Sequence, residues 1–144
     1  ALATARRNRH GVALLYIDLD RFKPVNDTYG HAVGDLLLKE AAGRMRACVR
    51  ESDTVGRFGG DEFVVLLPVV ELGEDALRVA EKIRVALAEP FLLAGLCLDV
   101  SSSIGVALYP EDGRDEETLL LSADRIMYEA KRKGRDQVAA SGFG

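Results

Sequence analysis

The feature that most constrains the fold is a pair of adjacent glycines, Gly59-Gly60, between two strand-like segments, 54–58 and 63–67. Such a pair predicts a β-hairpin, because glycine adopts the positive φ that tight hairpin turns need. Asp61 and Glu62 follow the pair directly, so the hairpin would present two carboxylates in front of an apolar strand. A bend without Cβ atoms would also let a ligand phosphate approach the backbone closely. The alternative is an ordinary hairpin whose acidic side chains are merely solvated.

A second strand-like segment ends in another carboxylate. Residues 12–17 form an apolar run typical of a buried central strand, and Asp18 follows it. A neighbouring strand in the sheet would bring Asp18 opposite Asp61. Two hard carboxylate oxygens suit Mg²⁺, which leaves its other positions to water and substrate phosphates. Asp20 lies on the same strand face as Asp18 if the strand continues, or else caps the following turn.

The remaining elements predict a single layered α/β (α+β) domain with a mixed central β-sheet flanked by helices. Apolar residues recur at helical spacing in three segments and at strand spacing in others. The predicted elements are a turn-rich stretch over 18–34, helices over 38–50, 72–87 and 119–130, a strand pair 91–93 and 96–100 around Gly95, a strand over 100–108, and an edge strand over 137–140. Pro90 and Gly134 are placed to end the second and third helices.

Composition narrows the function classes. The chain is 48% hydrophobic and 29% charged with a net charge of −4, which excludes charge-driven disorder and argues against a partner that is a nucleic-acid polymer. A single nucleotide held through a metal ion stays open. The two cysteines, Cys48 and Cys97, form no metal spacing or disulfide framework, and no segment has the pattern of a membrane span or a signal peptide. We therefore expect a cytoplasmic protein, or the cytoplasmic part of a larger one.

Four motifs in order resemble the GGDEF domain, the diguanylate cyclase family. The first motif is residues 59–63, which spell Gly-Gly-Asp-Glu-Phe. The second begins at residues 18–23 and continues with Asn26-Asp27, Gly30-His31 and Gly34-Asp35. The other two are residues 103–107 and residues 123–131. The resemblance covers nearly all of 1–144 as a single domain. It implies a fold like the palm of polymerases and nucleotidyl cyclases. It also implies that two GTP-loaded subunits face each other, each 3′-hydroxyl attacking the other's α-phosphate, to give cyclic di-GMP and two pyrophosphates.

The resemblance also assigns roles at the catalytic centre. Asp18, the Leu19 carbonyl and Asp61 would bind Mg²⁺ or Mn²⁺, two ions per active site, beside the Gly59-Gly60 bend. Two ions held in this way would lower the pKa of an attacking hydroxyl and neutralise a leaving pyrophosphate. Glu62 resembles a further metal ligand or a hydroxyl-activating carboxylate.

The family places an Asn and an Asp at the base of the nucleotide, which match Asn26 and Asp35. The Watson–Crick edge of guanine presents N–H donors, so it needs acceptors of this kind, whereas the lone pair of adenine N1 would repel a carboxylate. The alternative is that Asn26 starts a turn and Asp35 caps the following helix.

Basic residues match the family's phosphate contacts. Lys131 and Arg135 match its triphosphate-binding residues near the end of the last helix. Independently of the family, backbone amides from Arg21 through Phe22 to Lys23 are placed to form a turn that cradles phosphate. The alternative for Lys131 and Arg135 is a basic cluster that complements the C-terminus of a helix.

An Arg-x-x-Asp pattern, Arg50 and Asp53, matches the family's inhibitory site for cyclic di-GMP. Arginine meets phosphate or guanine bidentately, and aspartate accepts from guanine. Lys82 occupies a position where relatives often carry a supporting arginine, so we expect weaker product binding. The alternative is a surface salt bridge.

Two functions follow from these motifs. The first is an active diguanylate cyclase that needs a homodimer for catalysis. The second is a non-catalytic GGDEF module that binds GTP or cyclic di-GMP and regulates a neighbouring domain, such as an EAL domain; a plain scaffold would need none of the polar matches. The family's Asp-x-Leu-Thr-Gly-Leu-x-Asn-Arg stretch is absent, and residues 2–9 resemble the tail of the helix that follows it. We therefore expect an N-terminally trimmed domain of a larger protein with a covalently linked sensor or EAL domain.

Overall fold

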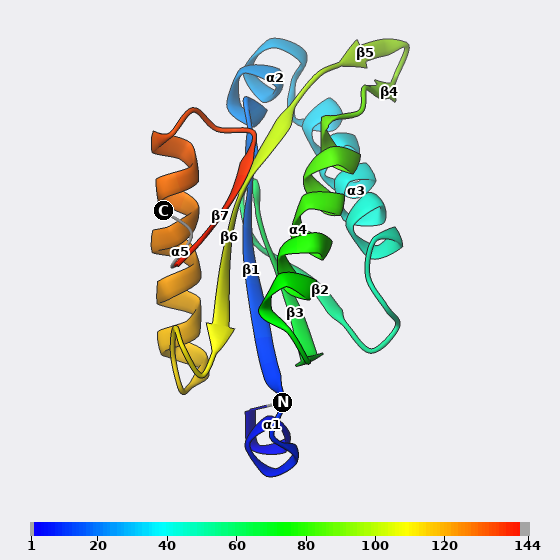
Figure 1. The fold of residues 1–144 in the computed structure, drawn as a ribbon. Coiled ribbons are helices and arrows are strands. Elements are labelled where there is room, and N and C mark those ends of the chain that lie inside the picture. The colour runs from blue at the N-terminus through cyan, green and yellow to red at the C-terminus, as the bar shows by residue number, and fades with distance from the viewer. Residues whose placement is uncertain (1, 142–144) are drawn as a thin grey trace.

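The computed structural model describes residues 2–141, and its centre is a five-stranded sheet in the order β2-β3-β1-β6-β7 (Figure 1). The strands are β1 (Gly11–Asp20), β2 (Thr54–Gly59), β3 (Glu62–Val70), β6 (Ser101–Tyr109) and β7 (Gln137–Ala140). Neighbouring strands pair antiparallel except β6 and β7, which are parallel. The predicted mixed sheet flanked by helices is confirmed.

Helices cover both faces of this sheet. Helices α3 (His31–Ala47) and α4 (Gly73–Ala88) pack on one face, and α5 (Glu116–Arg132) packs on the other (Figure 1). The central strand β1 is buried on both faces because its side chains alternate between them. Leu15 and Ile17 join the core under α3 and α4, whereas Leu14 and Tyr16 join the core under α5. This double burial explains why the strand reads as a continuous apolar run.

The short elements lie at the two ends of the sheet. Helix α1 (Leu2–Asn8) precedes β1 at one end, and α2 (Phe22–Tyr29) follows β1 at the other end (Figure 1). Strands β4 (Phe91–Leu93) and β5 (Leu96–Leu98) form the separate hairpin predicted around Gly95. Because the β2–β3 turn also lies at the α2 end, the segments that carry the sequence motifs converge there.

The prediction of a turn-rich stretch over 18–34 was wrong, since this stretch contains helix α2 and the first turn of α3. Pro24 fits because it lies in the first turn of α2, where backbone N–H groups have no helical partner. Gly34, which suggests a turn in the sequence, is buried inside α3, and a Cβ there would clash with the side chain of Asn26. This glycine therefore permits the close approach of α2 and α3.

The other predicted elements are present with small changes in their ends. Strand β3 runs through Pro68 to Val70, and β1 shows a register shift opposite this part of β3, which accommodates the missing N–H. Helix α5 begins at a capping box in which Asp115 and Thr118 cap each other's backbone. Over the described residues 2–141, none of the helices combines the length and the apolar character that crossing a membrane requires.

Candidate active site

A cleft of about 570 Å³ opens at the end of the sheet where β1 ends. Three segments far apart in the sequence line it: the end of β1 with the start of α2, the β2–β3 turn, and the end of α5. The lining residues are Asp18, Leu19, Asp20, Arg21, Phe22, Lys23, Pro24, Asp61, Lys131, Gly134 and Arg135. The cleft thus combines three residues predicted to bind metal, Asp18, Leu19 and Asp61, with those predicted to bind triphosphate, whereas Glu62 does not line it.

The turn of the β2–β3 hairpin lies one residue beyond the predicted Gly59-Gly60 pair. Gly59 pairs with Glu62, so Gly60 and Asp61 are the turn residues, and Gly59 and Gly60 both have positive φ, at 148° and 50°. Consequently Glu62, and not Asp61, lies directly opposite Asp18. The Leu19 N–H donates to the Asp61 carbonyl at 3.1 Å, which ties the turn to β1.

Asp18 is the most perturbed carboxyl group in the cleft. The residue is only 5% exposed, and burial raises the pKa of Asp18 to about 6. The Lys131 ammonium forms an ion pair with Asp18 and opposes this shift, whereas the Asp61 carboxylate raises the pKa further. The carboxylates of Asp18 and Asp61 are therefore close enough to interact, as the metal hypothesis requires.

The donor set at this point fits a hard divalent cation. Asp18 Oδ1 is buried and has no hydrogen-bond partner, which leaves a carboxylate oxygen that lacks a donor or a cation. Asp18, Asp61 and the Leu19 carbonyl would supply oxygen ligands to Mg²⁺, and phosphate and water would supply the rest. Within residues 2–141, no group of three or more His, Cys, Asp or Glu side chains forms a ready-made metal cage.

Glu62 is held by a residue that the sequence analysis missed. The Tyr16 hydroxyl donates to Glu62 Oε1 at 3.2 Å, and the ring of Tyr16 packs edge-on against Phe58 with centroids 5.9 Å apart. Burial raises the pKa of Tyr16, and the Glu62 carboxylate raises it further. Tyr16 therefore stays protonated as a donor to Glu62. Its position inside an apolar strand gives no signal of this contact in the sequence.

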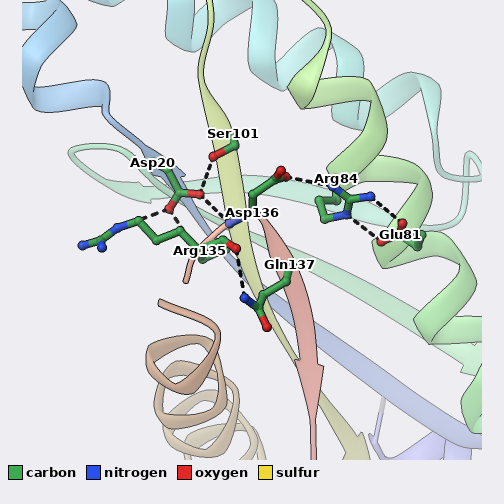
Figure 2. A network of polar contacts seen from close by, with 8 residues as sticks. Asp20, Glu81, Arg84, Ser101, Arg135, Asp136 and Gln137 are labelled. Atoms are coloured by element: carbon green, nitrogen blue, oxygen red, sulfur yellow. Dashed lines mark hydrogen bonds and ion pairs between the residues drawn. The ribbon is translucent and has the colours of Figure 1, made fainter. Parts of the chain in front are cut away.

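Strand β1 continues to Asp20, so Asp20 lies on the same strand face as Asp18, but protein donors occupy both of its carboxylate oxygens. Its Oδ2 accepts from the Ser101 hydroxyl at 2.7 Å and from the Asp136 N–H at 3.0 Å, and its Oδ1 accepts from the Ser103 hydroxyl at 2.8 Å (Figure 2). These donors occupy both oxygens of a side chain that is 1% exposed. Asp20 thus joins β1, β6 and the segment after α5.

The basic residues line the cleft from two sides. Burial alone would lower the pKa of Lys131, but the Asp18 carboxylate outweighs it and the net direction is upward. Arg135 is largely exposed, with its Nε 3.9 Å from Asp20 Oδ1. Phe22 is half-buried against the core, and Lys23 is exposed and lies 3.8 Å from Asp27. Arg21, with φ of 67°, turns the chain sharply from β1 into α2.

The two predicted guanine-binding residues lie on α2 and α3. Asn26 Nδ2 lies 3.1 Å from His31 Nδ1, and its side chain packs against Gly34, which directly precedes Asp35. Asp35 is the fifth residue of α3, so it does not cap that helix. Asp35 is exposed and lines a separate cavity of about 430 Å³ between α3 and β2, which Asn26 does not line.

The predicted inhibitory residues Arg50 and Asp53 lie outside the cleft. The Arg50 N–H donates to Asp53 Oδ2 at 2.8 Å, the Arg50 guanidinium donates to the Val69 carbonyl at 3.0 Å, and both residues line a cavity of about 370 Å³. Asp53 Oδ1 is buried without a partner, so it remains an open acceptor. Lys82 does not line this cavity, although it is near Cys48, which does: burial raises the pKa of the Cys48 thiol and the Lys82 ammonium lowers it.

Comparison with known proteins is consistent with this site. Residues 1–137 match the family model described as diguanylate cyclase, GGDEF domain. The chain is 48% identical over 136 residues to the diguanylate cyclase TpbB of Pseudomonas aeruginosa, and 47% identical over 136 residues to the bifunctional diguanylate cyclase/cyclic di-GMP phosphodiesterase MucR of the same organism. Each alignment covers 94% of this chain. This chain belongs to the GGDEF domain family, which confirms the resemblance found in the sequence.

Solved structures agree in fold. The crystal structure of the TpbB GGDEF domain superimposes with a TM-score of 0.95 at 44% identity and covers 99% of this chain and 89% of that one. The GGDEF domain of DgcB from Caulobacter crescentus with its coiled coil, in complex with c-di-GMP, gives a TM-score of 0.85 at 27% identity, covering 97% and 74% of the two chains. The chain spans only 31% of full-length TpbB and 20% of MucR.

Proposed function

We propose that this chain is the catalytic domain of a diguanylate cyclase, which condenses two GTP into cyclic di-GMP and two pyrophosphates. The observation that carries the proposal is the unpartnered buried oxygen of Asp18, beside Asp61, in the cleft that Lys131 and Arg135 also line. A buried carboxylate without a donor is costly unless a ligand completes it. Carboxylates for a cation and basic side chains for phosphates are the combination that a nucleoside triphosphate needs.

In this proposal Asp18, Asp61 and the Leu19 carbonyl hold Mg²⁺ or Mn²⁺, two ions per site, next to the triphosphate. When bound there, the ions would lower the pKa of the attacking 3′-hydroxyl and offset the charge of the leaving pyrophosphate. Glu62, oriented by Tyr16, serves as a further ligand or receives the hydroxyl proton. The 3′-oxygen bonds to the α-phosphorus as the bond from that phosphorus to the pyrophosphate breaks.

The chain's other residues bind and orient GTP. Lys131 moves from its ion pair with Asp18 to the triphosphate, and Arg135 joins it from the end of α5. Asn26 and Asp35 accept the N–H donors of guanine. The backbone at Phe22 and Lys23, where α2 begins, faces the same cleft.

The product contains two nucleotides and each chain has one such cleft, so we propose that catalysis needs a homodimer in which two clefts face each other. In the whole protein a sensor or EAL domain would control this pairing. The relatives support this view, since this chain matches only a part of each and MucR is described as bifunctional. Arg50 and Asp53, with the open Asp53 oxygen, would bind cyclic di-GMP and arrest the enzyme.

The test is to incubate the protein, concentrated or fused to a dimerising coiled coil, with GTP and Mg²⁺ and to measure cyclic di-GMP by chromatography. Asp61→Ala should abolish synthesis while the thermal unfolding midpoint stays near that of the parent. Asp99→Ala, which changes an exposed aspartate outside the cleft, is the matched control and should keep full activity. Equal synthesis by Asp61→Ala and the parent would refute the assignment of the metal site.

Two further outcomes separate the alternatives. If the dimerised parent binds GTP or cyclic di-GMP but makes no product, the non-catalytic regulatory module becomes the better description. Arg50→Ala should relieve inhibition by added cyclic di-GMP, and unchanged inhibition would reject the Arg50–Asp53 site.

A further inference from the structure

The segment directly after α5 has an unusual backbone. Gly134, Arg135 and Asp136 follow one another with φ of 122°, 62° and 47°. Positive φ suits glycine, but Arg135 and Asp136 both carry a Cβ and are strained in this region. Such strain persists only where contacts with surrounding residues hold the backbone in place, and it is found most often at functional sites.

One anchor of this segment is Asp20. The Asp136 N–H donates to Asp20 Oδ2 at 3.0 Å, and hydroxyl groups of Ser101 and Ser103 hold the same carboxylate from β6. Asp20 belongs to the central strand and is almost fully buried, so it is a rigid point of attachment. The Arg135 N–H also donates to the carbonyl of Ala130, at the end of α5, at 3.0 Å.

The second anchor is Arg84 on α4. Its Nη1 donates to Asp136 Oδ1 at 2.8 Å, and its Nε and Nη2 donate to the two oxygens of Glu81 at 2.7 and 2.6 Å (Figure 2). A guanidinium held in this bidentate manner has little freedom to move. Asp136 is therefore fixed at its backbone by Asp20 and at its side chain by Arg84.

These two anchors also constrain Arg135, which lies between the end of α5 and Asp136. Its backbone is fixed on both sides, and its side chain lines the cleft with Nε 3.9 Å from Asp20 Oδ1. We infer that Asp20 and Arg84 are positioning residues, which hold the strained segment 134–136 so that Arg135 is aimed at the triphosphate. This inference rests on the proposed function, and it extends the site to α4, a helix that does not line the cleft.

The chemistry argues against the simpler assignment of Asp20 to the metal. Both of its oxygens already accept hydrogen bonds at 3.0 Å or less, and a metal would have to displace at least one of these donors. Asp18 next to it has a free oxygen instead. Asp20 is thus suited to hold the protein backbone, and Asp18 is suited to a ligand.

The test compares binding of 3′-deoxy-GTP, which lacks the attacking hydroxyl, with binding of GMP, both with Mg²⁺ and by calorimetry. Arg84→Met should weaken 3′-deoxy-GTP about tenfold, the value of one charge-assisted hydrogen bond to phosphate, and change GMP less than about twofold. Asp136→Asn, which changes the other member of the Arg84–Asp136 ion pair, should weaken 3′-deoxy-GTP selectively as well. Arg78→Met is the matched control, because Arg78 lies on α4 and, among residues 2–141, forms its ion pair with Asp75, away from the cleft.

A double-mutant cycle makes the inference specific. If Arg84 acts through Arg135, then Arg135→Met should lower the affinity for 3′-deoxy-GTP at least as much as Arg84→Met does, and adding Arg84→Met to it should cause no further loss. Additive losses would overturn the inference, as would equal weakening of both nucleotides or no weakening of either. Arg84→Lys, which retains a donor for Asp136, should recover part of the triphosphate affinity.

These measurements do not depend on turnover. A wild-type protein that makes no cyclic di-GMP contradicts the proposed function but leaves the binding cycle intact. A wild-type protein that binds 3′-deoxy-GTP no more tightly than GMP overturns the inference whatever its activity. Asp20→Asn should selectively weaken the binding of 3′-deoxy-GTP in the same way. If this buried substitution prevents folding, Asp136→Asn still tests the inference, because the Asp136 side chain is exposed.

Discussion

Replacing Asp18 with asparagine should stabilise the metal-free protein near neutral pH, although it removes a residue of the proposed active site. Asp18 is 5% exposed, its Oδ1 has no partner, and the Asp61 carboxylate is adjacent. Asparagine has nearly the same shape and carries no charge, so it removes the cost of holding a carboxylate there. The substitution also removes the ion pair with Lys131, and this loss offsets part of the gain. The offset is only partial because the Lys131 ammonium is then free to turn toward solvent.

The magnitude follows from the pKa of Asp18, which rises from 3.8 to about 6 on folding. The folded state then binds more protons than the unfolded state between about pH 4 and pH 6, so the ionisation of Asp18 lowers stability as the pH rises through this window. A shift of about 2 pKa units corresponds to about 3 kcal/mol as an upper limit. This shift already includes the attraction of the Lys131 ammonium. We therefore expect Asp18→Asn to be more stable by about 1–3 kcal/mol above pH 6 and by almost nothing at pH 4.

Urea denaturation of both proteins at pH 4, 5, 6 and 7.5, with a metal chelator present, measures this difference directly. Titration with Mg²⁺ should then stabilise the parent by mass action and leave Asp18→Asn nearly unchanged. The reasoning is refuted if Asp18→Asn is less stable than the parent at pH 7.5 without metal, or if the difference between them does not shrink toward pH 4.

Three other substitutions test the supporting structure. Tyr16→Phe removes the donor to Glu62 and should cost about 0.5–1.5 kcal/mol in the free energy of unfolding, and a neutral result would show that the contact is not formed in solution. Arg44→Met removes three hydrogen bonds from the Arg44 guanidinium to backbone carbonyls in the last turn of α4 and just beyond it. It also removes the stacking of that guanidinium on Phe91, 3.7 Å from the ring centroid. Chemical denaturation should therefore show that the free energy of unfolding falls by about 2–4 kcal/mol. Gly105→Ala would place a Cβ in steric clash with the Ala123 carbonyl oxygen and the Met127 backbone nitrogen of α5, and should prevent stable folding. A folded protein with an unchanged unfolding midpoint would contradict the close packing of α5 on β6.

Much of the fold is predictable from the sequence because most elements bury a face with a regular period. Strand β1 and the three long helices each carry many apolar residues at the expected spacing, and their order along the chain then predicts the layers. Helix α2 was not predicted because it is short, Val25 is its one buried residue, and Pro24, Asn26 and Asp27 are residues typical of turns. Tertiary packing against α3 stabilises it, and local pattern does not reveal such packing.

The hairpin register is the second point at which the sequence is insufficient. Two glycines in a row permit a turn at either of two places, and only pairing with β1 decides between them. In the structure the turn lies at Gly60-Asp61, which brings Glu62 into the sheet opposite Asp18 and leaves Asp61 at the rim. Proximity of the carboxylates was predictable, but their individual roles depend on this shift of one residue.

Two residues of the cleft, Asp18 and Arg135, share a physical property: each is in a state that is unfavourable for folding. Asp18 is ionisable and buried, and Arg135 adopts a backbone conformation that disfavours side chains. A sequence selected for stability alone would carry an amide or an apolar residue at the first position and glycine at the second. Their cost is offset by contacts with remote partners, Lys131 for Asp18 and the Asp20–Asp136–Arg84 network for Arg135. Because these partners meet only after folding, no local pattern in the sequence reveals how the cost at Asp18 and Arg135 is offset.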